Sequence, residues 1–256
     1  MTRHLLVVGA QRCGTTYLHS LLDAHPEVAM ARPSRPEPKV FLSDDVVTRG
    51  LRWYHEAFFA HATSEALLGE KSTSYLDHPA AAARAARVLG EAEIVALLRD
   101  PVERAVSNWR FSTDHGLETR PLETALRETL AAPTPWDPAS TSVSPFAYLE
   151  RGRYADALEP WLAAFPATTH VVLLHDLLDD DGAVGGLYAD LGLDASYRPP
   201  DRDRPVNQSR QPRPDLPDDL LHVLREYFRD SDEALARMLG RDLPWPSPAT
   251  RGGTHA

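Results

Sequence analysis

Short runs of consecutive apolar residues alternate along this chain with longer segments in which apolar residues recur every three or four positions. Residues 5–8 are apolar throughout, which is typical of a strand that is buried on both faces. An i, i+3, i+4 spacing of leucines then predicts a helix over residues 15–23. Pro26 ends this helix, because the residue before a proline is driven out of the helical region. The chain therefore begins as a strand, a loop and a helix.

The same alternation continues along the rest of the chain. Further strands are predicted at residues 28–30, 67–69, 94–98 and 170–174. Helices are predicted at residues 50–59, 80–89, 101–115, 122–131, 153–164, 183–191, 217–229 and 231–239. Strands that alternate with helices favour an α/β fold, in which helices cover a mostly parallel sheet.

Two segments rich in proline have no apolar periodicity. Residues 132–145 form a loop that is long enough to act as a lid over a site. Residues 196–217 form a second irregular segment, which is basic. We find no internal repeat and no clear linker. We therefore expect a single domain over residues 1–246, followed by a loose C-terminal tail over residues 247–256.

The charge balance narrows the range of partners. The 256 residues include 27 basic and 37 acidic ones, which gives a net charge of −10. An acidic surface disfavours nucleic acid, anionic membranes and long polyanionic glycans. A single small anion can still bind in a locally basic pocket.

Cysteine and histidine usage points to an intracellular protein without a metal. The single cysteine excludes an internal disulfide and is typical of a reducing compartment. No segment resembles a signal peptide or a membrane span, since the first apolar run is far too short. The 11 histidines are scattered and form no metal-ligand cluster. We expect a soluble, cytoplasmic protein with no bound metal.

The first loop has the spacing of a phosphate-binding loop but lacks its lysine. A nucleoside-triphosphate loop reads G-x-x-x-x-G-K-[ST]. Gly9, Gly14 and Thr16 keep that spacing, whereas Thr15 replaces the lysine and the nearest cation is Arg12. A loop between a strand and a helix gathers unpaired backbone N–H groups around one point, which favours an anion. The alternative is an ordinary glycine-containing turn.

A second candidate phosphate site follows the most apolar predicted strand, in the sequence "LLRDPVERAVSNW". Arg99 ends this strand, and Ser107 lies about two turns into the helix that Pro101 begins. Ligands of α/β sheets bind at the carboxyl ends of strands, so Arg99 and the first loop are expected to face one crevice. In the alternative, Arg99 pairs with Asp100 or Glu103 and Ser107 is merely solvated.

Together, "GAQRCGTT" and "LLRDPVERAVSNW" resemble the signatures of sulfotransferases that use 3′-phosphoadenosine 5′-phosphosulfate (PAPS). Further segments are similar to heparan sulfate glucosaminyl sulfotransferases and their bacterial relatives, over about residues 4–245: "DAHPEVAMA", "EPKVF", "RGLRWYHEAFF", "GEKSTSYL", "GRYADALEPWLAAFP" and "EYFRDSDEALARMLGRDLPW". The resemblance implies the sulfotransferase fold, a three-layer α/β sandwich similar to P-loop NTPases, with a central parallel sheet flanked by helices. It also implies PAPS as donor substrate, 3′-phosphoadenosine 5′-phosphate (PAP) as product, and no metal.

The resemblance assigns donor contacts to three parts of the chain. The 5′-phosphosulfate goes to the first loop, at Gln11, Arg12, Cys13, Gly14, Thr15 and Thr16. The 3′-phosphate, which distinguishes PAPS from ATP, goes to Arg99 and Ser107. Ser209 and Arg210 stand where glycosaminoglycan enzymes carry a Lys-Gly segment, and are weaker candidates. Cys13 is expected to be a small buried filler of the loop.

The resemblance also assigns catalytic roles. Glu37 matches the base that takes the proton of the acceptor, Arg12 would stabilise the leaving phosphate, and Lys71 would contact the sulfonate oxygens. A histidine often follows this glutamate by two positions in relatives, whereas this chain has Lys39. In the alternatives, Glu37 is a solvated loop residue and Lys71 pairs with Glu70 on the surface.

These observations predict a sulfotransferase acting on a hydroxyl or an amine of a small acceptor. The net negative charge disfavours a heparin-like polymer and favours a small neutral or cationic molecule, such as a sugar or a bacterial secondary metabolite. The abundance of Ala, Arg and Pro is typical of a high-GC bacterium. The alternatives are a P-loop kinase or NTPase, and a nucleotide-binding protein without chemistry.

Overall fold

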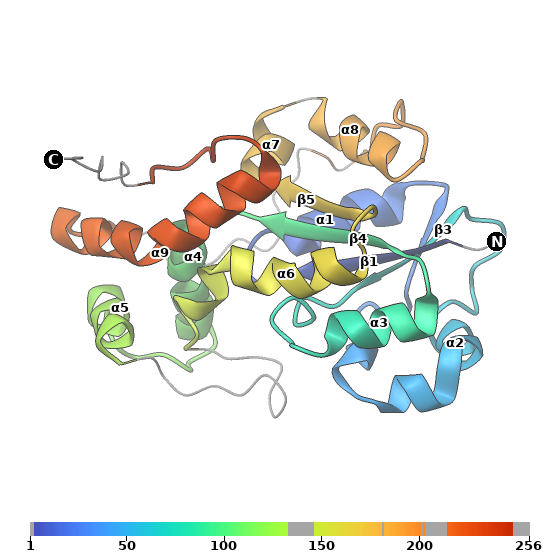
Figure 1. Cartoon of the computed structure of the whole chain (residues 1–256), viewed down its shortest axis with the longest axis horizontal. Helices are drawn as coiled ribbons and strands as arrows, with labels where there is room; N and C mark the ends of the chain where they lie inside the picture. The colour runs from blue at the N-terminus through green and yellow to red at the C-terminus, as the bar shows by residue number, and fades with distance from the viewer. Residues whose placement is uncertain (1–2, 133–145, 181, 201, 203–213, 248–256) are drawn as a thin grey trace, which may run out of the picture. The chain divides into compact units, whose positions relative to one another are not determined.

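The computed structural model describes residues 3–132, 146–180, 182–200, 202 and 214–247 (Figure 1). The described residues form two compact units. The first comprises residues 3–99, 157–180, 182–200 and 202, and the second comprises residues 100–132, 146–156 and 214–247. The predicted lid lies outside the described residues from Pro133 onward, as does the predicted tail from Pro248 onward. The expectation of a single domain stays a prediction.

A parallel sheet is the centre of the first unit. Within the described residues its strands are β1 (Arg3–Gly9), β2 (Val28–Met30), β3 (Leu67–Lys71), β4 (Glu93–Leu98) and β5 (Thr169–Leu173), in the order β2-β3-β1-β4-β5. The register places Val7 of β1 opposite Lys71 of β3 on one side and Val95 of β4 on the other. The carboxyl ends of these three strands therefore lie at the same edge of the sheet.

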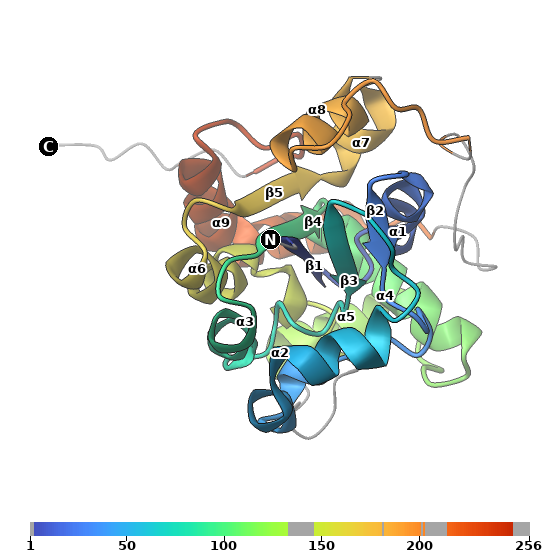
Figure 2. The same ribbon diagram turned by 90° about the vertical axis from the view of Figure 1, so that its right-hand side faces the viewer.

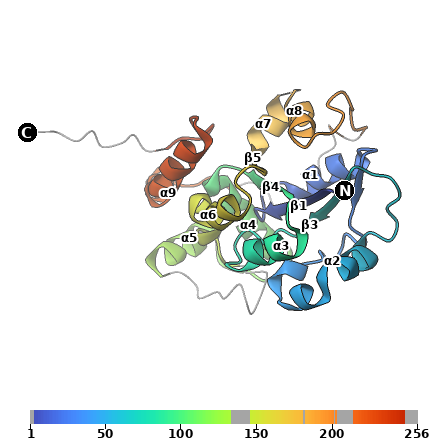
Figure 3. The same ribbon diagram turned by 45° about the vertical axis from the view of Figure 1, so that its right-hand side comes forward.

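Helices of the first unit cover both faces of this sheet. One face packs on α1 (Thr15–Ala24), α7 (Leu174–Asp179) and α8 (Ala183–Asp190), in a core that includes Leu5, Val7, Leu18, Leu22, Leu177 and Leu187. Figure 2 shows α3 (Ala81–Leu89) on the opposite side of the sheet from α1 and α8, and Figure 3 shows the same arrangement from another angle. These three layers confirm the predicted α/β sandwich with a central parallel sheet.

The remaining elements of the first unit extend the layer around α3. They are the short 3₁₀ helix η1 (Val40–Leu42), α2 (Asp45–Phe58) and the part of α6 (Tyr154–Ala164) from residue 157 onward. The side chain of Trp161 on α6 is fully buried and stacks on Phe165. α2 begins five residues earlier than predicted and is kinked at Gly50, whose φ of 74° favours glycine.

The second unit is helical within its described residues. Its elements are α4 (Pro101–Asp114), α5 (Leu122–Ala131), η2 (Glu150–Gly152), the first residues of α6, and α9 (Asp218–Leu239). Pro101 stands at the first helical position of α4, as predicted, and the Asp100 carboxylate accepts a hydrogen bond from the Val102 N–H at 2.9 Å. Apolar residues of α4, α5 and α9 form its core, including Val102, Ala105, Leu126, Leu220, Leu224 and Phe228.

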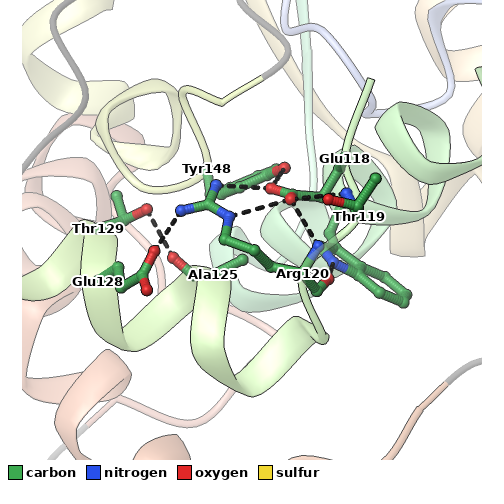
Figure 4. Close-up of polar contacts among 8 residues, drawn as sticks. Glu118, Thr119, Arg120, Ala125, Glu128, Thr129 and Tyr148 are labelled. Atoms are coloured by element: carbon green, nitrogen blue, oxygen red, sulfur yellow. Dashed lines mark hydrogen bonds and ion pairs between the residues drawn. The ribbon is translucent and has the colours of Figure 1, made fainter. Parts of the chain in front are cut away.

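A buried carboxylate ties three segments of the second unit together (Figure 4). Glu118 is 4% exposed, and it accepts hydrogen bonds from the Arg120 guanidinium at 2.6 Å and from the Tyr148 hydroxyl at 2.8 Å. Arg120 also pairs with Glu128 on α5. Burial acts to raise the pKa of Glu118, but the hydrogen bonds from Arg120 and Tyr148 outweigh it and lower that pKa to about 2. Glu118 therefore stays ionised.

Two predictions of secondary structure were wrong. Helices at residues 217–229 and 231–239 are one continuous helix, α9, because Ser231 and Asp232 are buried in it instead of breaking it. The six-residue helix α7 directly follows β5 and was not predicted. In the sequence alone, polar residues at the centre of a helix are easily taken for a break, because the sequence does not show that they are buried.

Candidate active site

The carboxyl ends of β1, β3 and β4 form the edge at which the candidate residues of the first unit gather. In the strand order, β1 lies between β3 and β4. The chain runs from β1 to β2 on one side of it, and from β3 across to β4 on the other side. Such a point of a parallel sheet is where α/β proteins bind ligands. The loop after β1, the residues after β3, and Arg99 after β4 all start from this edge.

The loop after β1 is anchored to both neighbouring strands. The Ala10 N–H donates to the carbonyl of Leu97 on β4 at 2.9 Å. The side-chain amide of Gln11 donates to the Ser74 hydroxyl, beyond β3, at 3.0 Å. The loop is therefore held in a defined position between the two strands.

Glycine is required at the end of this loop. Gly14 has a φ of 87° and precedes α1, and a Cβ atom there would lie 2.8 Å from the side chain of Leu174. Arg12 also adopts a positive φ, 70°, which turns the backbone within the loop. This backbone therefore requires glycine at position 14, and its role in binding an anion stays a prediction.

The N-terminus of α1 offers donors to an anion. Its first turn contains no acidic side chain, so no carboxylate of that turn competes for its N–H groups. Thr15 is buried and Thr16 is partly exposed. Cys13 is fully buried, and its thiol lies 3.9 Å from the carbonyl of Gln11. This position agrees with Cys13 as a small filler of the loop.

Arg99 lies against the same loop. One of its guanidinium nitrogens, Nη1, donates to the carbonyl of Arg12 at 3.4 Å. The Asp100 carboxylate, one alternative partner, is instead bound by both terminal nitrogens of Arg225, at 2.7 and 2.6 Å. Ser107 is partly exposed on α4, in the second unit, and its contact with a 3′-phosphate stays a prediction.

Glu37 and Lys71 meet at the end of β3. The Lys71 ammonium forms an ion pair with Glu37 Oε1. The other oxygen, Oε2, accepts hydrogen bonds from the Thr73 N–H at 3.0 Å and from the Thr73 hydroxyl at 3.1 Å. Only 17% of the Glu37 side chain and 11% of the Lys71 side chain are exposed. The two charges therefore share a largely enclosed environment, with further donors fixing the carboxylate.

Both alternatives for these residues are wrong. Glu37 is not a solvated loop residue, because its carboxylate has protein partners on both oxygens. Lys71 pairs with Glu37, and the adjacent Glu70 points into the interior, where it is fully buried. Neighbours in a strand point to opposite faces, which separates Lys71 from Glu70.

Several charged groups lie near His19 on α1. His19 lies one turn after Thr15, and burial is the main reason why its pKa is lowered from the ordinary value. The Lys71 ammonium lowers it further, as do Arg32 and Arg35, whereas Asp23 acts in the opposite direction. Lys71 and Arg32 are themselves paired with Glu37 and Asp23, so charges of both signs lie close to His19.

Several residues at this edge were missed by the sequence analysis. Thr73 binds Glu37, Ser74 binds Gln11, and Ser72 connects Glu70 to the backbone of Lys39. Three hydroxyl residues in succession directly after a strand end are the signal that could have indicated them. Ser209 and Arg210, the weaker candidates for donor contacts, lie outside the described residues.

The described residues contain no cluster of three or more His, Cys, Asp or Glu side chains that could hold a metal ion. None of the helices in the part of the chain that the structure covers is both long and apolar enough to cross a membrane.

Comparisons with known proteins agree with this geometry. The family model described as "Sulfotransferase domain" matches residues 2–178. A bifunctional heparan sulfate N-deacetylase/N-sulfotransferase 1 of Mus musculus is 32% identical over 182 residues, which cover 70% of this chain and 20% of the relative. The membrane-associated sulfotransferase kil1 of Dictyostelium discoideum is 31% identical over 111 residues, covering 43% of this chain and 23% of the relative.

This chain matches only about a fifth of the length of these curated relatives. The crystal structure of a sulfotransferase from Alicyclobacillus acidocaldarius has the same fold, with a TM-score of 0.74 and 23% identity over 95% of this chain and 98% of that one. The family model covers well over half of the chain, including the first loop, Glu37, Lys71 and Arg99. The chain therefore belongs to the sulfotransferase domain family.

Proposed function

We propose that this protein transfers the sulfuryl group of PAPS to a hydroxyl or an amine of a small acceptor. The observation that carries the proposal is the enclosed pair of Glu37 and Lys71, which stands at the same sheet edge as the phosphate-type loop. Membership of the sulfotransferase domain family supports the reaction type. The identity of the donor and the role of each residue are parts of the proposal.

Donor binding would use the backbone donors of the first loop and four cationic or hydroxyl side chains. The N–H groups of residues 11–16 would hold the 5′-phosphosulfate. Arg99 and Ser107 would bind the 3′-phosphate, and Arg99 already contacts the loop backbone. Ser209 and Arg210 would add weaker contacts.

The transfer would be an in-line displacement at sulfur. A lone pair of the acceptor oxygen or nitrogen forms the new bond to sulfur, while the bond from sulfur to the 5′-phosphate oxygen breaks. The electron pair of that bond leaves with PAP, where Arg12 would stabilise the developing charge. The proton of the acceptor goes to the Glu37 carboxylate. Lys71, already paired with Glu37, would contact the sulfonate oxygens.

The charge of the chain narrows the choice of acceptor. The net charge of −10 disfavours a long polyanion such as heparan sulfate, although relatives are named for that polymer. We therefore favour a small neutral or cationic acceptor, such as a sugar or a bacterial secondary metabolite, in a cytoplasmic protein.

The test is incubation with PAPS and a panel of sugars, phenols and amines, followed by mass spectrometry. We expect one acceptor to gain the mass of a sulfuryl group while PAP forms in equal amount. Turnover of ATP with Mg²⁺ in place of PAPS would instead indicate a kinase or NTPase. Tight binding of PAP, without transfer to any acceptor, would indicate a nucleotide-binding protein that lacks chemistry.

A further inference from the structure

We propose that Glu70 is a positioning residue for the reaction. Its buried carboxylate would hold residues 37–41 in place through the hydroxyls of Ser72 and Tyr75, and thereby set the position of Glu37. The inference rests on the proposed function, in which Glu37 is the base. Glu70 itself lies in the interior and would touch neither substrate.

The Glu70 carboxylate is 0% exposed and accepts hydrogen bonds from three hydroxyl groups. Oε1 accepts the Ser72 hydroxyl at 2.7 Å and the Tyr75 hydroxyl at 2.5 Å. Oε2 accepts the Tyr54 hydroxyl at 2.6 Å. Burial raises the pKa of Glu70, whereas these three hydrogen bonds act to lower it. A carboxylate with this many donors is the centre of a network and not an isolated buried charge.

Two of these hydroxyls also accept hydrogen bonds from backbone N–H groups of the segment that carries Glu37. The Lys39 N–H donates to the Ser72 hydroxyl at 2.9 Å, and the Phe41 N–H donates to the Tyr75 hydroxyl at 3.2 Å. A hydroxyl has one proton and two lone pairs. Because the Ser72 and Tyr75 hydroxyls each donate their one hydrogen bond to Glu70, their lone pairs are left to accept hydrogen bonds from the amides.

The segment needs such support because little regular structure holds it. Within residues 37–41 only the short 3₁₀ helix η1 begins, at Val40. Lys39 has a φ of 54°, a conformation that is costly for a residue with a side chain. The amides of Lys39 and Phe41 are the points at which the Glu70 network takes hold of this backbone. A shift of the segment by about 1 Å at a catalytic group can cost about 10²-fold in rate.

Tyr54 provides a matched control for Tyr75. Both are buried tyrosines whose hydroxyls donate to Glu70, but only the Tyr75 hydroxyl accepts the Phe41 N–H. In Tyr54→Phe and Tyr75→Phe, the same group is removed from the same carboxylate. We expect both substitutions to lower the melting temperature, since each leaves Glu70 short of one donor, and Tyr75→Phe to lower it more because the Phe41 N–H also loses its acceptor.

The two substitutions should differ in catalysis. With PAPS and the best acceptor of the panel, Tyr75→Phe and Ser72→Ala should lower kcat by about 10-fold or more, and Tyr54→Phe should leave it near the wild-type value. The Kd of PAP from calorimetry should stay unchanged in all three variants. Equal losses of kcat in the two tyrosine variants, or wild-type kcat in Tyr75→Phe and Ser72→Ala, would overturn the inference.

Amide hydrogen exchange of the wild-type protein tests the network without any variant or acceptor. We expect protection of the Lys39 and Phe41 amides, comparable to that of the Tyr75 amide, which donates to the Ser72 carbonyl at 3.1 Å. Rapid exchange at both positions would contradict the inference even if the enzyme transfers sulfuryl groups. A wild-type protein that has protected amides but does not bind PAP or transfer sulfuryl groups would contradict the proposed function instead.

Discussion

Lys71 and Glu37 form an ion pair at the carboxyl end of β3, although 34 positions separate them in the chain. Thr73 adds two hydrogen bonds to the same carboxylate. The pair joins the segment after β2 to the strand beside the phosphate-type loop. Because both side chains are largely enclosed, each charge depends on the other, and we expect the two groups to act on one reacting centre.

Replacing the base should separate chemistry from donor binding. Glu37→Gln keeps the shape of the side chain but removes its ability to take a proton, so transfer should fall by about 10²-fold or more. The Kd of PAP, measured by calorimetry, should stay nearly unchanged because the proposed role of Glu37 is toward the acceptor. Glu56→Gln, at an exposed ion pair with Arg52 on α2, is the control. Wild-type turnover in Glu37→Gln would show that another base serves the reaction.

Arg12 allows charge to be distinguished from shape. Arg12→Ala should lower turnover by about 10²–10³-fold, the usual effect of removing one preorganised donor of positive charge. Arg12→Lys should keep much of the activity, since a point charge can still reach a phosphate oxygen. Steady-state rates of both variants test this. Equal inactivity would mean that the fork of the guanidinium matters more than its charge, and full activity of Arg12→Ala would remove Arg12 from the mechanism.

Arg99 should determine recognition of the 3′-phosphate. Arg99→Ala should cost about 2–4 kcal/mol of binding free energy for PAP, because a bound phosphate loses its charged partner. Binding of adenosine 5′-phosphate, which lacks the 3′-phosphate, should be weak and change little. Arg52→Ala, which removes an exposed ion pair with Glu56 on α2, is the control. The assignment fails if calorimetry gives the wild-type protein equal affinity for both nucleotides.

Asp232 should make the second unit less stable as the pH rises. Burial raises its pKa from the ordinary 3.8 to about 7, helped by the charge of Asp100 and opposed by Trp245 and Arg225. The folded state therefore holds a proton that the unfolded state releases, so this group stabilises fully below about pH 4 and loses that effect as the pH rises through about 7.

Asp232→Asn should remove this pH dependence while keeping the oxygen that accepts the Trp245 indole N–H at 3.1 Å. Urea unfolding of both proteins between pH 5 and pH 8 gives the comparison: the stability of the wild-type protein should fall relative to that of Asp232→Asn up to about pH 7, where the difference should level off. Parallel stability curves for the two proteins would show that Asp232 does not titrate in this range.

Most of the fold could be predicted from the sequence. Each of the five observed strands was predicted, because continuous apolar runs identify strands that are covered on both faces. The prediction failed where local pattern and burial disagree. A helix break was predicted at residue 230, yet α9 continues through it, and Ser231 and Asp232 are buried inside the helix. The helix α7 was missed because six residues are too few to show periodicity.

The candidate site was predictable only in part. The first loop is a local feature, since the spacing of Gly9, Gly14 and Thr16 stands in one short segment. Glu37 and Lys71 were indicated by resemblance to a family, and nothing in the residues between them predicts their contact. The network of Glu70 with Tyr54, Ser72 and Tyr75 was not predicted at all.

By itself, the sequence determined the elements and the anion-binding turn, because backbone conformation and the unpaired N–H groups at a helix start depend on residues close together in the chain. Only the tertiary structure decided which carboxylate meets Lys71 and which glutamate is buried behind it. Parallel strands bring distant loops to one edge of the sheet. Lys71 and Glu70 are successive residues of β3 and point to opposite faces, so Lys71 meets Glu37 while Glu70 is buried. These contacts depend on packing between residues that are distant in the chain, and the spacing of residues along the sequence does not predict them.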